Sequence, residues 1–393
     1  MKIAVVGAGI TGITAAYYLA RDGHEVVVYD QESYPAMRTS YANGGQLSVS
    51  NSETWNTWSN VHKGLAWMFR PDAPLLIRPD LDLRKYHWLA RFLWHTVDGT
   101  QRSNTQETIR LGLEARKLYH QITAEENLEF DQSLCGILHF YKNPGYFDNA
   151  VNIRGLYEIN GCEWEIIDRD RVLEIEPTLK NSAGIIGGAW TPSDWTGDIH
   201  RFCYDLATVL ANRYQVEFHF NTVITDLQEL EIFFDAVVVS TGVGSVRLAH
   251  SVGDTLPIYP VKGYSITVEL DDHSARFAPT VSLLDDQAKI VTARLGNRFR
   301  VAGTAELAGE NYDIRRSRIL PLLTWVHENF PDVNTSQYRS WACLRPMTPN
   351  MMPIVRQSSR DPKIFYNTGH GHLGWTTGAA TGRHVADLVK TRL

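Results

Sequence analysis

The feature that most constrains the fold is a glycine loop between two apolar runs near the start of the chain. Residues 3–6 (Ile-Ala-Val-Val) precede Gly-Ala-Gly-Ile-Thr-Gly at positions 7–12, and an Ala- and Leu-rich segment follows. An Asp-Gly pair interrupts that segment before a second β-rich run, residues 25–29, which leads into Asp30. This order predicts a strand, a tight turn, a helix and a second strand parallel to the first.

Each glycine of the loop has a physical role in such a unit. Gly7 permits the turn, Gly9 lets backbone N–H groups approach a pyrophosphate at the helix N-terminus, and Gly12 lets helix and strand pack closely. Asp30 is placed to accept hydrogen bonds from a ribose hydroxyl, and its charge would repel the 2′-phosphate of NADP. The loop therefore predicts binding of FAD or NAD and does not distinguish them. The alternative is a glycine turn in an ordinary αβ unit.

The composition limits the class of protein. The 393 residues are 44% hydrophobic and 21% charged, as in a globular enzyme of two or three structural units. A net charge of −6 gives no basic field for nucleic acid, so we expect no nucleic-acid partner. The four cysteines contain no C-x-x-C pair, which indicates a reducing compartment and predicts neither a disulfide framework nor a metal site.

The chain carries no sequence signal for export or for a membrane span. The apolar run after Lys2 is too short for a signal peptide, and charges interrupt every longer apolar stretch. We therefore expect a cytoplasmic protein, with peripheral association at the inner face of the cytoplasmic membrane left open.

Beyond residue 30 the strand–helix rhythm of a simple NAD dehydrogenase domain does not continue, which predicts an interrupted dinucleotide fold. Helices are expected over residues 107–127, 199–213, 315–330 and 374–389. Strands are expected over residues 136–141, 163–167, 216–220, 222–227, 232–239, 257–269, 289–295, 298–302 and 364–366.

Three later motifs carry a family resemblance. They are Tyr-Pro-Val-Lys-Gly-Tyr-Ser at 259–265, Leu-Arg-Pro-Met-Thr-Pro at 344–349, and Asn-Thr-Gly-His-Gly-His-Leu-Gly-Trp-Thr at 367–376. Together with the N-terminal loop, and with shorter stretches at 67–69, 196–198 and 220–223, they resemble the small subunit of FAD-dependent D-amino acid dehydrogenases. That family belongs to the D-amino acid oxidase, glycine oxidase and sarcosine oxidase superfamily. The similarity runs in order from one end of the chain to the other.

The resemblance implies a fold and its division. The fold class would be α/β, with an FAD-binding Rossmann-like domain interleaved with a mixed-sheet α+β substrate domain. Residues 1–60, 165–253 and 336–393 would form the FAD-binding domain, and residues 61–164 and 254–335 the substrate domain.

The resemblance also implies the cofactor contacts. Asp30 would hold the adenosine ribose, the backbone at Val223 would meet the adenine, and the turn at 369–373 would cover the isoalloxazine ring. The helix after that turn would direct its positive end at the flavin. The residues expected to bind FAD are Gly7, Gly9, Ile10, Thr11, Gly12, Asp30, Gln31, Asn43, Gly44, Gly45, Gln46, Val223, Thr241, Gly242, Gly369, Gly371, His372, Leu373 and Gly374.

The expected chemistry needs few acid–base groups. Oxidation of an α-amino acid moves a hydride from Cα to flavin N5, so the protein must chiefly orient the Cα–H bond and hold the carboxylate. Arg345 is the candidate carboxylate clamp, because a guanidinium matches a carboxylate bidentately. Tyr264 shares a strand face with Lys262 and is a candidate for a second carboxylate contact, against half-buried core as the alternative.

Two histidines stand in the last motif. His370 and His372 are candidates to donate to the flavin or to steer the substrate amine. They also read as an H-x-H metal pair, but no third ligand is evident, so we expect no metal.

Several positions depart from the family pattern. Asn350-Met351 replaces Asp-Gly, Arg356 replaces a small residue and His372 replaces Thr, while residues 47–60 are polar and contain two tryptophans. These changes lie near the expected site and leave the identity of the substrate open. Cys343 stands where sarcosine oxidases carry a flavin-linked cysteine, so a covalent bond to FAD is one hypothesis and a buried inert thiol the alternative.

An aromatic stretch between residues 64 and 97 has two interpretations. Its aromatic and aliphatic side chains alternate with arginines, as in an amphipathic patch that docks on a membrane, and family members pass electrons to a quinone pool. The alternative is packing between the two domains. The members of this stretch are Trp67, Phe69, Leu75, Leu76, Ile77, Trp88, Leu89, Phe92 and Trp94.

Three functions follow in competition. The first is oxidative deamination of a D-amino acid to a 2-oxo acid and ammonia, with electrons passed to a quinone or another carrier. The second is an amine oxidase that acts on glycine, sarcosine or hydroxyproline and uses oxygen. The third is a flavoprotein that acts on a protein partner or in maturation. Arg345 favours the first two, because a carboxylate clamp implies a small amino-acid substrate.

Overall fold

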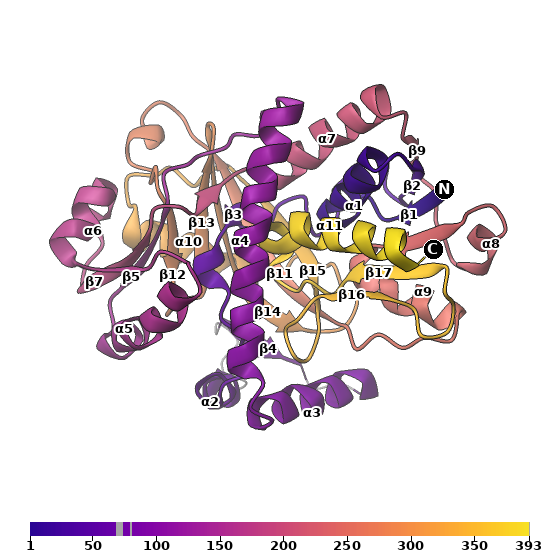
Figure 1. Ribbon diagram of the computed structural model, residues 1–393. Coiled ribbons are helices and arrows are strands. Elements are labelled where there is room, and N and C mark those ends of the chain that lie inside the picture. Colours follow the sequence, from indigo (N-terminus) through magenta and orange to yellow (C-terminus); the bar gives the residue numbers. More distant parts are fainter. Residues whose placement is uncertain (68–73, 79–80, 393) are drawn as a thin grey trace.

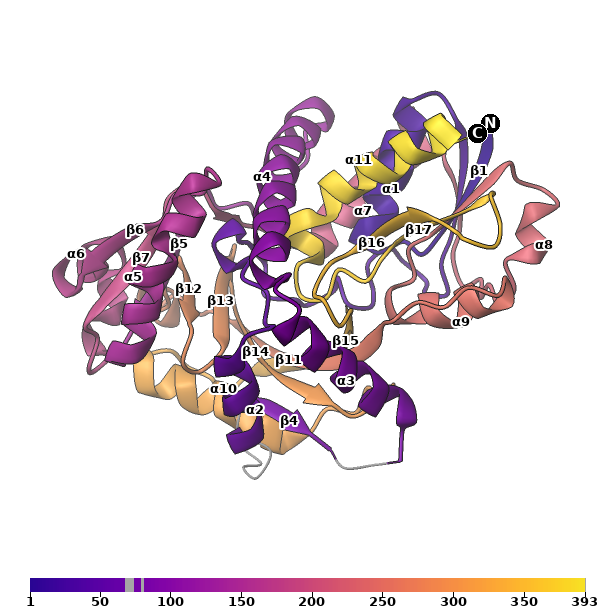
Figure 2. The ribbon, with the colours of Figure 1, turned by 60° about the horizontal axis from the view of Figure 1, so that its bottom comes forward.

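The chain folds around two β-sheets that share a long helix between them (Figure 1). The structure is a computed structural model that describes residues 1–67, 74–78 and 81–392. The termini of the described chain lie close together beside the smaller sheet in both ribbon views (Figures 1 and 2).

The smaller sheet contains the N-terminal strand–helix–strand unit that the glycine loop predicts. Its order is β16-β17-β10-β1-β2-β9, and all of its strand pairs are parallel except β16 with β17. The strands β1 and β10 are central, and their apolar runs are buried, as expected for a parallel sheet covered on both faces. The bounds are β1 (Lys2–Val6), β2 (Glu25–Tyr29), β9 (Glu217–His219), β10 (Ala236–Val239), β16 (Ile354–Gln357) and β17 (Ile364–Thr368).

Three helices pack with this sheet. They are α1 (Ile10–Arg21), α7 (Ile199–Arg213) and α11 (Gly374–Arg392). The helices α1 and α11 approach closely, because Thr14 Oγ1 donates to the Gly378 carbonyl at 2.9 Å and a Cβ at Gly382 would lie 2.7 Å from Thr14 Oγ1. The small residues on α11 therefore let the two helices meet.

The larger sheet contains both antiparallel and parallel strand pairs. Its order is β15-β11-β14-β13-β12-β5-β7-β6, and the short β4 pairs with β14. The helix α10 (Arg316–Asn329) covers one face with Ile319, Leu322 and Val326 (Figure 2). The bounds are β4 (Leu75–Ile77), β5 (Ile137–Tyr141), β6 (Glu165–Asp168), β7 (Gly187–Thr191), β11 (Tyr259–Glu269), β12 (Ser282–Asp285), β13 (Ile290–Leu295), β14 (Arg298–Leu307) and β15 (Tyr338–Met347).

The remaining elements connect and flank the sheets. The long helix α4 (Gln101–Glu126) packs on α11, and an aromatic cluster of Tyr119, Trp195 and Trp375 fills the space beside them. The short strands β3 (Gln46–Leu47) and β8 (Trp195–Thr196) pair with each other. The other helices are α2 (Trp58–Trp67), α3 (Leu83–Val97), α5 (Pro144–Ile159), α6 (Arg169–Ile175), α8 (Gln228–Glu231) and α9 (Ser245–Ser251).

The α/β fold class is confirmed, whereas some expected elements are wrong. Residues 222–227, expected as a strand, form no strand; Ile224 and Leu227 pack instead against the buried cluster beside β10. The helices α2, α3, α5 and α6 were not expected. Aromatic and charged residues together gave no clear period over 58–97, and tertiary packing supplies the stability that propensity does not.

The sheets also divide the chain differently from the expected domains. The strands β6, β7 and β15 belong to the larger sheet, although residues 165–253 and 336–393 were expected with the FAD-binding part. The domain limits themselves stay a prediction.

Candidate active site

A cavity of about 1420 Å³ extends between the two sheets, and the predicted site residues converge on it. Such a volume exceeds the usual range of roughly 300–1,000 Å³ for a small-molecule pocket, so it has room for a dinucleotide and a substrate together. All of the residues expected to bind FAD line it except Gly12 and Gly45, and so do Arg345, Tyr264, His370 and His372. The structure therefore brings together residues that lie more than 300 positions apart in the sequence.

The glycine loop forms one end of the cavity. Gly7 has φ +105°, and a Cβ there would lie 2.6 Å from the Ser240 carbonyl oxygen. A Cβ at Gly12 would lie 1.7 Å from the Gly7 carbonyl oxygen, so only glycine lets α1 approach the loop. Gly9 is the N-cap of α1 and supplies no side chain, which leaves the positive helix end open to the cavity.

Two side chains fix the surroundings of the loop. Asp30 accepts hydrogen bonds from Ala8 N at 2.6 Å and from Glu32 N at 2.8 Å, which holds its carboxylate at the end of β2. Burial raises the pKa of Asp30, although these two N–H donors oppose the shift. Ser40 Oγ accepts from Ile10 N at 3.2 Å and so caps α1 from a distant loop.

The C-terminal glycine turn forms the opposite wall. Gly369 and Gly371 have φ +76° and +57°, which favour glycine, and α11 begins at Gly374 with its N-terminal end at the cavity. The positive ends of α1 and α11 thus both face the same space. The buried Ser240 Oγ, which also lines this space, has no hydrogen-bond partner within the described residues. A large anionic cofactor such as FAD fits these features.

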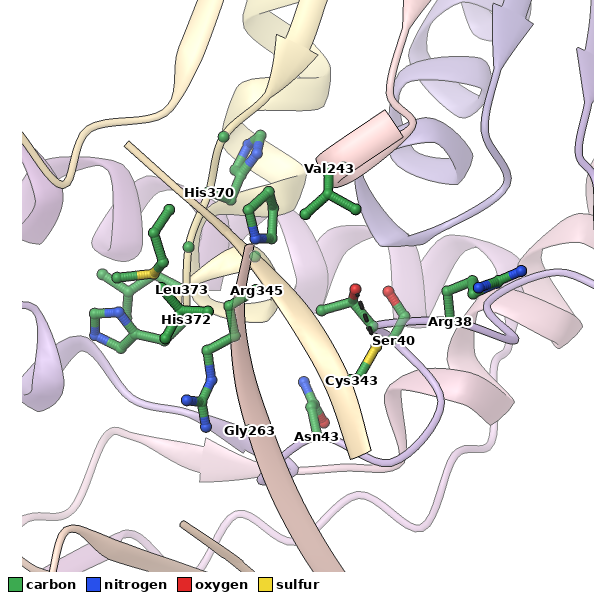
Figure 3. Close-up of a pocket in the computed structure, with 18 of the residues that line it drawn as sticks. Arg38, Ser40, Asn43, Val243, Gly263, Cys343, Arg345, His370, His372 and Leu373 are labelled. Atoms are coloured by element: carbon green, nitrogen blue, oxygen red, sulfur yellow. Dashed lines mark hydrogen bonds between the residues drawn. The ribbon is translucent and has the colours of Figure 1, made fainter. Parts of the chain in front are cut away.

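Arg345 is a charged group in the cavity wall. It lies on β15, its guanidinium passes over Gly263 of β11, and Nη1 donates to the Thr304 carbonyl at 2.9 Å (Figure 3). No carboxylate pairs with it in the part of the chain that the structure describes. Burial lowers the pKa of Arg345 to about 10. Arg345 is half-buried and lines the cavity, so its unpaired positive charge is available to an anionic ligand there.

Tyr264 does not join Arg345. It shares a face of β11 with Lys262, as expected, but that face is turned away from the guanidinium. The Tyr264 hydroxyl donates to buried Glu306 Oε2 at 2.6 Å, and Lys262 Nζ lies 3.9 Å from the same oxygen. The expected contact between Tyr264 and a substrate carboxylate therefore has no support from this geometry, because strand alternation places the two side chains on opposite faces.

The two histidines of the last motif have different surroundings. His370 Nε2 bonds Thr381 Oγ1 at 2.8 Å, which ties the turn to α11. His372 stacks on Trp55 with ring centroids 4.7 Å apart, and its buried Nε2 has no hydrogen-bond partner among the described residues. Burial lowers the pKa of both rings to about 3, and Arg345 adds to the shift at His372. Both rings are therefore neutral, and His372 lies on the same side of the cavity as Arg345 (Figure 3).

Cys343 also lines the cavity. It lies on β15 two residues before Arg345, so the two side chains share a face of the strand. Its Sγ donates to Thr39 Oγ1 at 3.2 Å, and burial raises the pKa of the thiol. A protonated thiol is a poor nucleophile, so this environment favours the inert alternative over a covalent bond to flavin.

The family departures reach the cavity only in part. His372 lines it, as do Asn51 and Trp55 of the altered 47–60 segment, whereas Asn350, Met351 and Arg356 do not. Met351 instead packs in a buried cluster with Trp88 and Met347, and Arg356 lies over the Tyr366 ring at 5.2 Å.

The aromatic stretch at 64–97 is partly buried, as the packing interpretation expects, and partly exposed, as the membrane-docking interpretation expects. Trp88, Leu89 and Phe92 pack in the cluster beside the cavity, whereas Leu83 is 79% and Trp94 65% exposed on α3. Phe69 and the side chain of Trp67 lie outside the described residues. In the described chain no helix combines the length and the apolar character that a bilayer span requires.

Sequence reasoning did not single out many residues of the cavity wall, among them Ser40, Gly263, Asp286 and Thr304. Gly263 belongs to the motif at 259–265, so the sequence marked the position. Its lack of a side chain leaves space for the Arg345 guanidinium. Asp286 accepts from the Tyr141 hydroxyl at 3.0 Å; burial raises the pKa of this carboxyl, but Lys289 and His139 outweigh that and hold it well below its usual range. Nothing local in the sequence marks Thr304.

Comparison with known proteins agrees with this geometry. The family described as FAD dependent oxidoreductase (DAO) matches residues 2–388. D-amino acid dehydrogenase 3 of Mesorhizobium japonicum is 46% identical and covers 100% of this chain and 98% of its own length. D-amino acid dehydrogenase of Paramagnetospirillum magneticum is 38% identical and covers 100% of this chain and 96% of its own length.

Solved structures share the fold at low sequence identity. Glycine oxidase from Geobacillus kaustophilus has a TM-score of 0.76 at 19% identity, covering 99% of this chain and 94% of its own. L-proline dehydrogenase from P. horikoshii has a TM-score of 0.74 at 15% identity, covering 99% and 93%. With the family match, the glycine loop and the cavity all in agreement, this chain belongs to the FAD dependent oxidoreductase family and uses FAD as its cofactor.

Proposed function

We propose that the protein is an FAD-dependent D-amino acid dehydrogenase, which oxidises a D-amino acid to the 2-imino acid that water converts to a 2-oxo acid and ammonia. The single observation that carries the proposal is the Arg345 guanidinium in the cavity wall without a carboxylate partner among the described residues. The relatives named D-amino acid dehydrogenase, at 46% and 38% identity, support the substrate class.

The residues of this chain would divide the work as follows. The glycine loop, Asp30 and the 369–374 turn would hold FAD, which when bound supplies a two-electron acceptor for the hydride of the substrate. Arg345 would bind the substrate carboxylate through charge-assisted hydrogen bonds. The neutral His372, which lines the cavity near Arg345, would pack beside the substrate without adding a charge.

The test uses anaerobic holoenzyme and panels of D- and L-amino acids, with flavin absorbance as the readout. We expect bleaching by D-amino acids alone. Arg345→Met should raise KM on the order of 100-fold or more, because two charge-assisted hydrogen bonds are lost. The exposed helix residue Arg154 supplies the matched control, Arg154→Met, which should behave as the wild type. Bleaching by L-amino acids alone, or an unchanged KM in Arg345→Met, contradicts the proposal.

For the electron acceptor we propose a quinone or another carrier, reached at the membrane surface through α3. This helix lines the cavity with Trp88, Leu89 and Phe92 and presents Leu83, Trp94 and Val97 to solvent. Admission of air after bleaching distinguishes oxygen from a quinone as the acceptor. The flavin of a dehydrogenase is reoxidised slowly by oxygen and rapidly by a soluble quinone analogue.

The membrane contact has its own test. The wild type should sediment with anionic phospholipid vesicles, and Trp94→Glu should not. Ile159→Glu, at an exposed apolar position on α5, is the matched control and should still sediment. Equal sedimentation of all three proteins contradicts a docking role for α3.

A further inference from the structure

The backbone at Thr304 is strained beside the Arg345 guanidinium. Thr304 has φ +62°, and it is the one β-branched residue among the non-glycine residues with positive φ in the described chain. A β-branched side chain is a genuine outlier in this region, and such strain persists only where the surrounding structure holds it. The position is the interior of β14, where no turn or helix end explains it.

A β-bulge accounts for the geometry. Lys262 pairs with Glu306 and Tyr264 with Gly303, so Thr304 and Ala305 together lie opposite the single residue Gly263. Bulges of this kind redirect groups beside active sites. Here the bulge turns the Thr304 carbonyl toward Arg345, where it accepts from Nη1 at 2.9 Å. Gly263 leaves the space that the guanidinium fills, since a Cβ there would lie 2.4 Å from Nη2.

Thr304 lies in the wall of the same cavity, and its hydroxyl is not satisfied. Thr304 lines the cavity and is 6% exposed, and its Oγ1 is buried without a hydrogen-bond partner among the described residues. A buried hydroxyl without a partner is costly, and polar groups inside proteins are nearly always paired. Strain and an unpaired hydroxyl at one residue, next to an unpaired arginine, point to a ligand group that satisfies both side chains.

We propose that Thr304 is a substrate-binding residue: its hydroxyl donates to the carboxylate that Arg345 binds, while its carbonyl fixes the guanidinium in place. This inference rests on the proposed function, since it names a second contact to the same carboxylate. It assigns to Thr304 the role that the sequence suggested for Tyr264, whose hydroxyl is engaged by Glu306.

The test compares variants that differ only in the hydroxyl. Thr304→Ser and Thr304→Ala both remove the branch methyl and keep the same backbone conformation, but only serine keeps the donor. In the holoenzyme, Thr304→Ala should raise KM for D-alanine about 10- to 100-fold, and kcat should change far less. The dissociation constant for propionate, read from the flavin absorbance change, should rise in parallel. Thr304→Ser should stay within about threefold of the wild type.

A third variant separates binding from folding. Thr304→Gly relieves the positive φ and should raise the melting temperature, while it loses the hydroxyl and should bind propionate as weakly as Thr304→Ala. A residue that only shapes the bulge would give a more stable protein with unchanged binding. Unchanged propionate binding in Thr304→Ala and Thr304→Gly therefore overturns the inference.

Arg345→Met distinguishes this failure from failure of the proposed function. If Arg345→Met weakens propionate binding and Thr304→Ala does not, the carboxylate clamp stands and the role of Thr304 is wrong. If the wild-type holoenzyme binds no propionate and no D-amino acid bleaches it, the proposed function fails and the inference fails with it.

Discussion

The cofactor end and the substrate wall of the cavity are built in opposite ways. At the cofactor end, one continuous segment, residues 7–30, supplies the loop, the helix end and the acidic residue. At the substrate wall, Gly263, Thr304, Arg345 and His372 come from four separate segments. Their relative placement depends on the register of β11 with β14 and β15. At the cofactor end, steric limits within one short segment fix the backbone. At the substrate wall, the positions of the side chains depend on pairing between strands that are distant in the sequence.

The sharpest test of the cofactor end is Gly12→Ala. Its Cβ would lie 1.7 Å from a backbone oxygen, which cannot move without displacing the loop. We expect the purified variant to hold less than about a tenth of the wild-type flavin, measured as flavin absorbance per protein. Gly155→Ala on α5, where a Cβ meets nothing within 4 Å, is the control and should keep its flavin. A fully yellow Gly12→Ala protein contradicts the steric argument.

The matching test of the substrate wall is Gly263→Ala. Its Cβ meets the far end of a flexible side chain, Arg345 Nη2 at 2.4 Å, so the guanidinium shifts and the fold survives. We expect normal flavin content and a KM for D-alanine raised roughly 30-fold, about 2 kcal/mol of lost binding. Flavin absorbance and steady-state kinetics measure both. Loss of flavin together with substrate binding would show that the two ends are not independent.

Tyr264→Phe tests whether the face of β11 that carries Tyr264 contributes to stability but not to substrate binding. The variant loses the hydrogen bond to buried Glu306, so the free energy of unfolding should fall by about 2 kcal/mol, while KM stays unchanged. Urea unfolding and kinetics are the measurements. A raised KM with unchanged stability would restore the substrate contact that the sequence suggested for Tyr264.

The buried histidines predict a loss of stability in acid. His370 has a pKa lowered to about 3, below the value of about 6.5 in the unfolded chain, so the unfolded state binds more protons between these values. Stability is full above pH 6.5 and falls as the pH drops through it, by about 1.4 kcal/mol at pH 5.5.

His370→Asn should lose less stability than the wild type between pH 8 and pH 5.5, by that same difference, in urea unfolding at the two pH values. An identical loss in both proteins would place the acid sensitivity elsewhere, with His372 the next residue to replace.

The comparison explains how much the sequence could predict. Gly7, Gly9, Gly12 and Asp30 were predictable because their roles follow from local sterics and spacing within one strand–helix–strand unit. Arg345 was identified through a motif resemblance, and the structure places it with the other predicted residues at one cavity.

The rest depended on information that is not local. Strand alternation placed Lys262 and Tyr264 together but did not tell that Arg345 lies on the other face of the sheet. Thr304 gave no signal, since a threonine in a strand normally has negative φ, and the bulge arises from pairing between distant strands. The helix α3 has aromatic residues on both its cavity side and its exposed side, Trp88 being buried and Trp94 exposed, which obscures the helical period.

The strand order of the smaller sheet has a consequence for biosynthesis. β1 ends at Val6, yet its neighbour β10 begins only at Ala236, and β17 and α11 close the same layer near the end of the chain. A nascent chain on the ribosome therefore exposes one edge of the β1–β2 pair through most of translation. The flavin site is completed only when α11 has emerged and packed on α1, so the N-terminal glycine loop alone does not make the site.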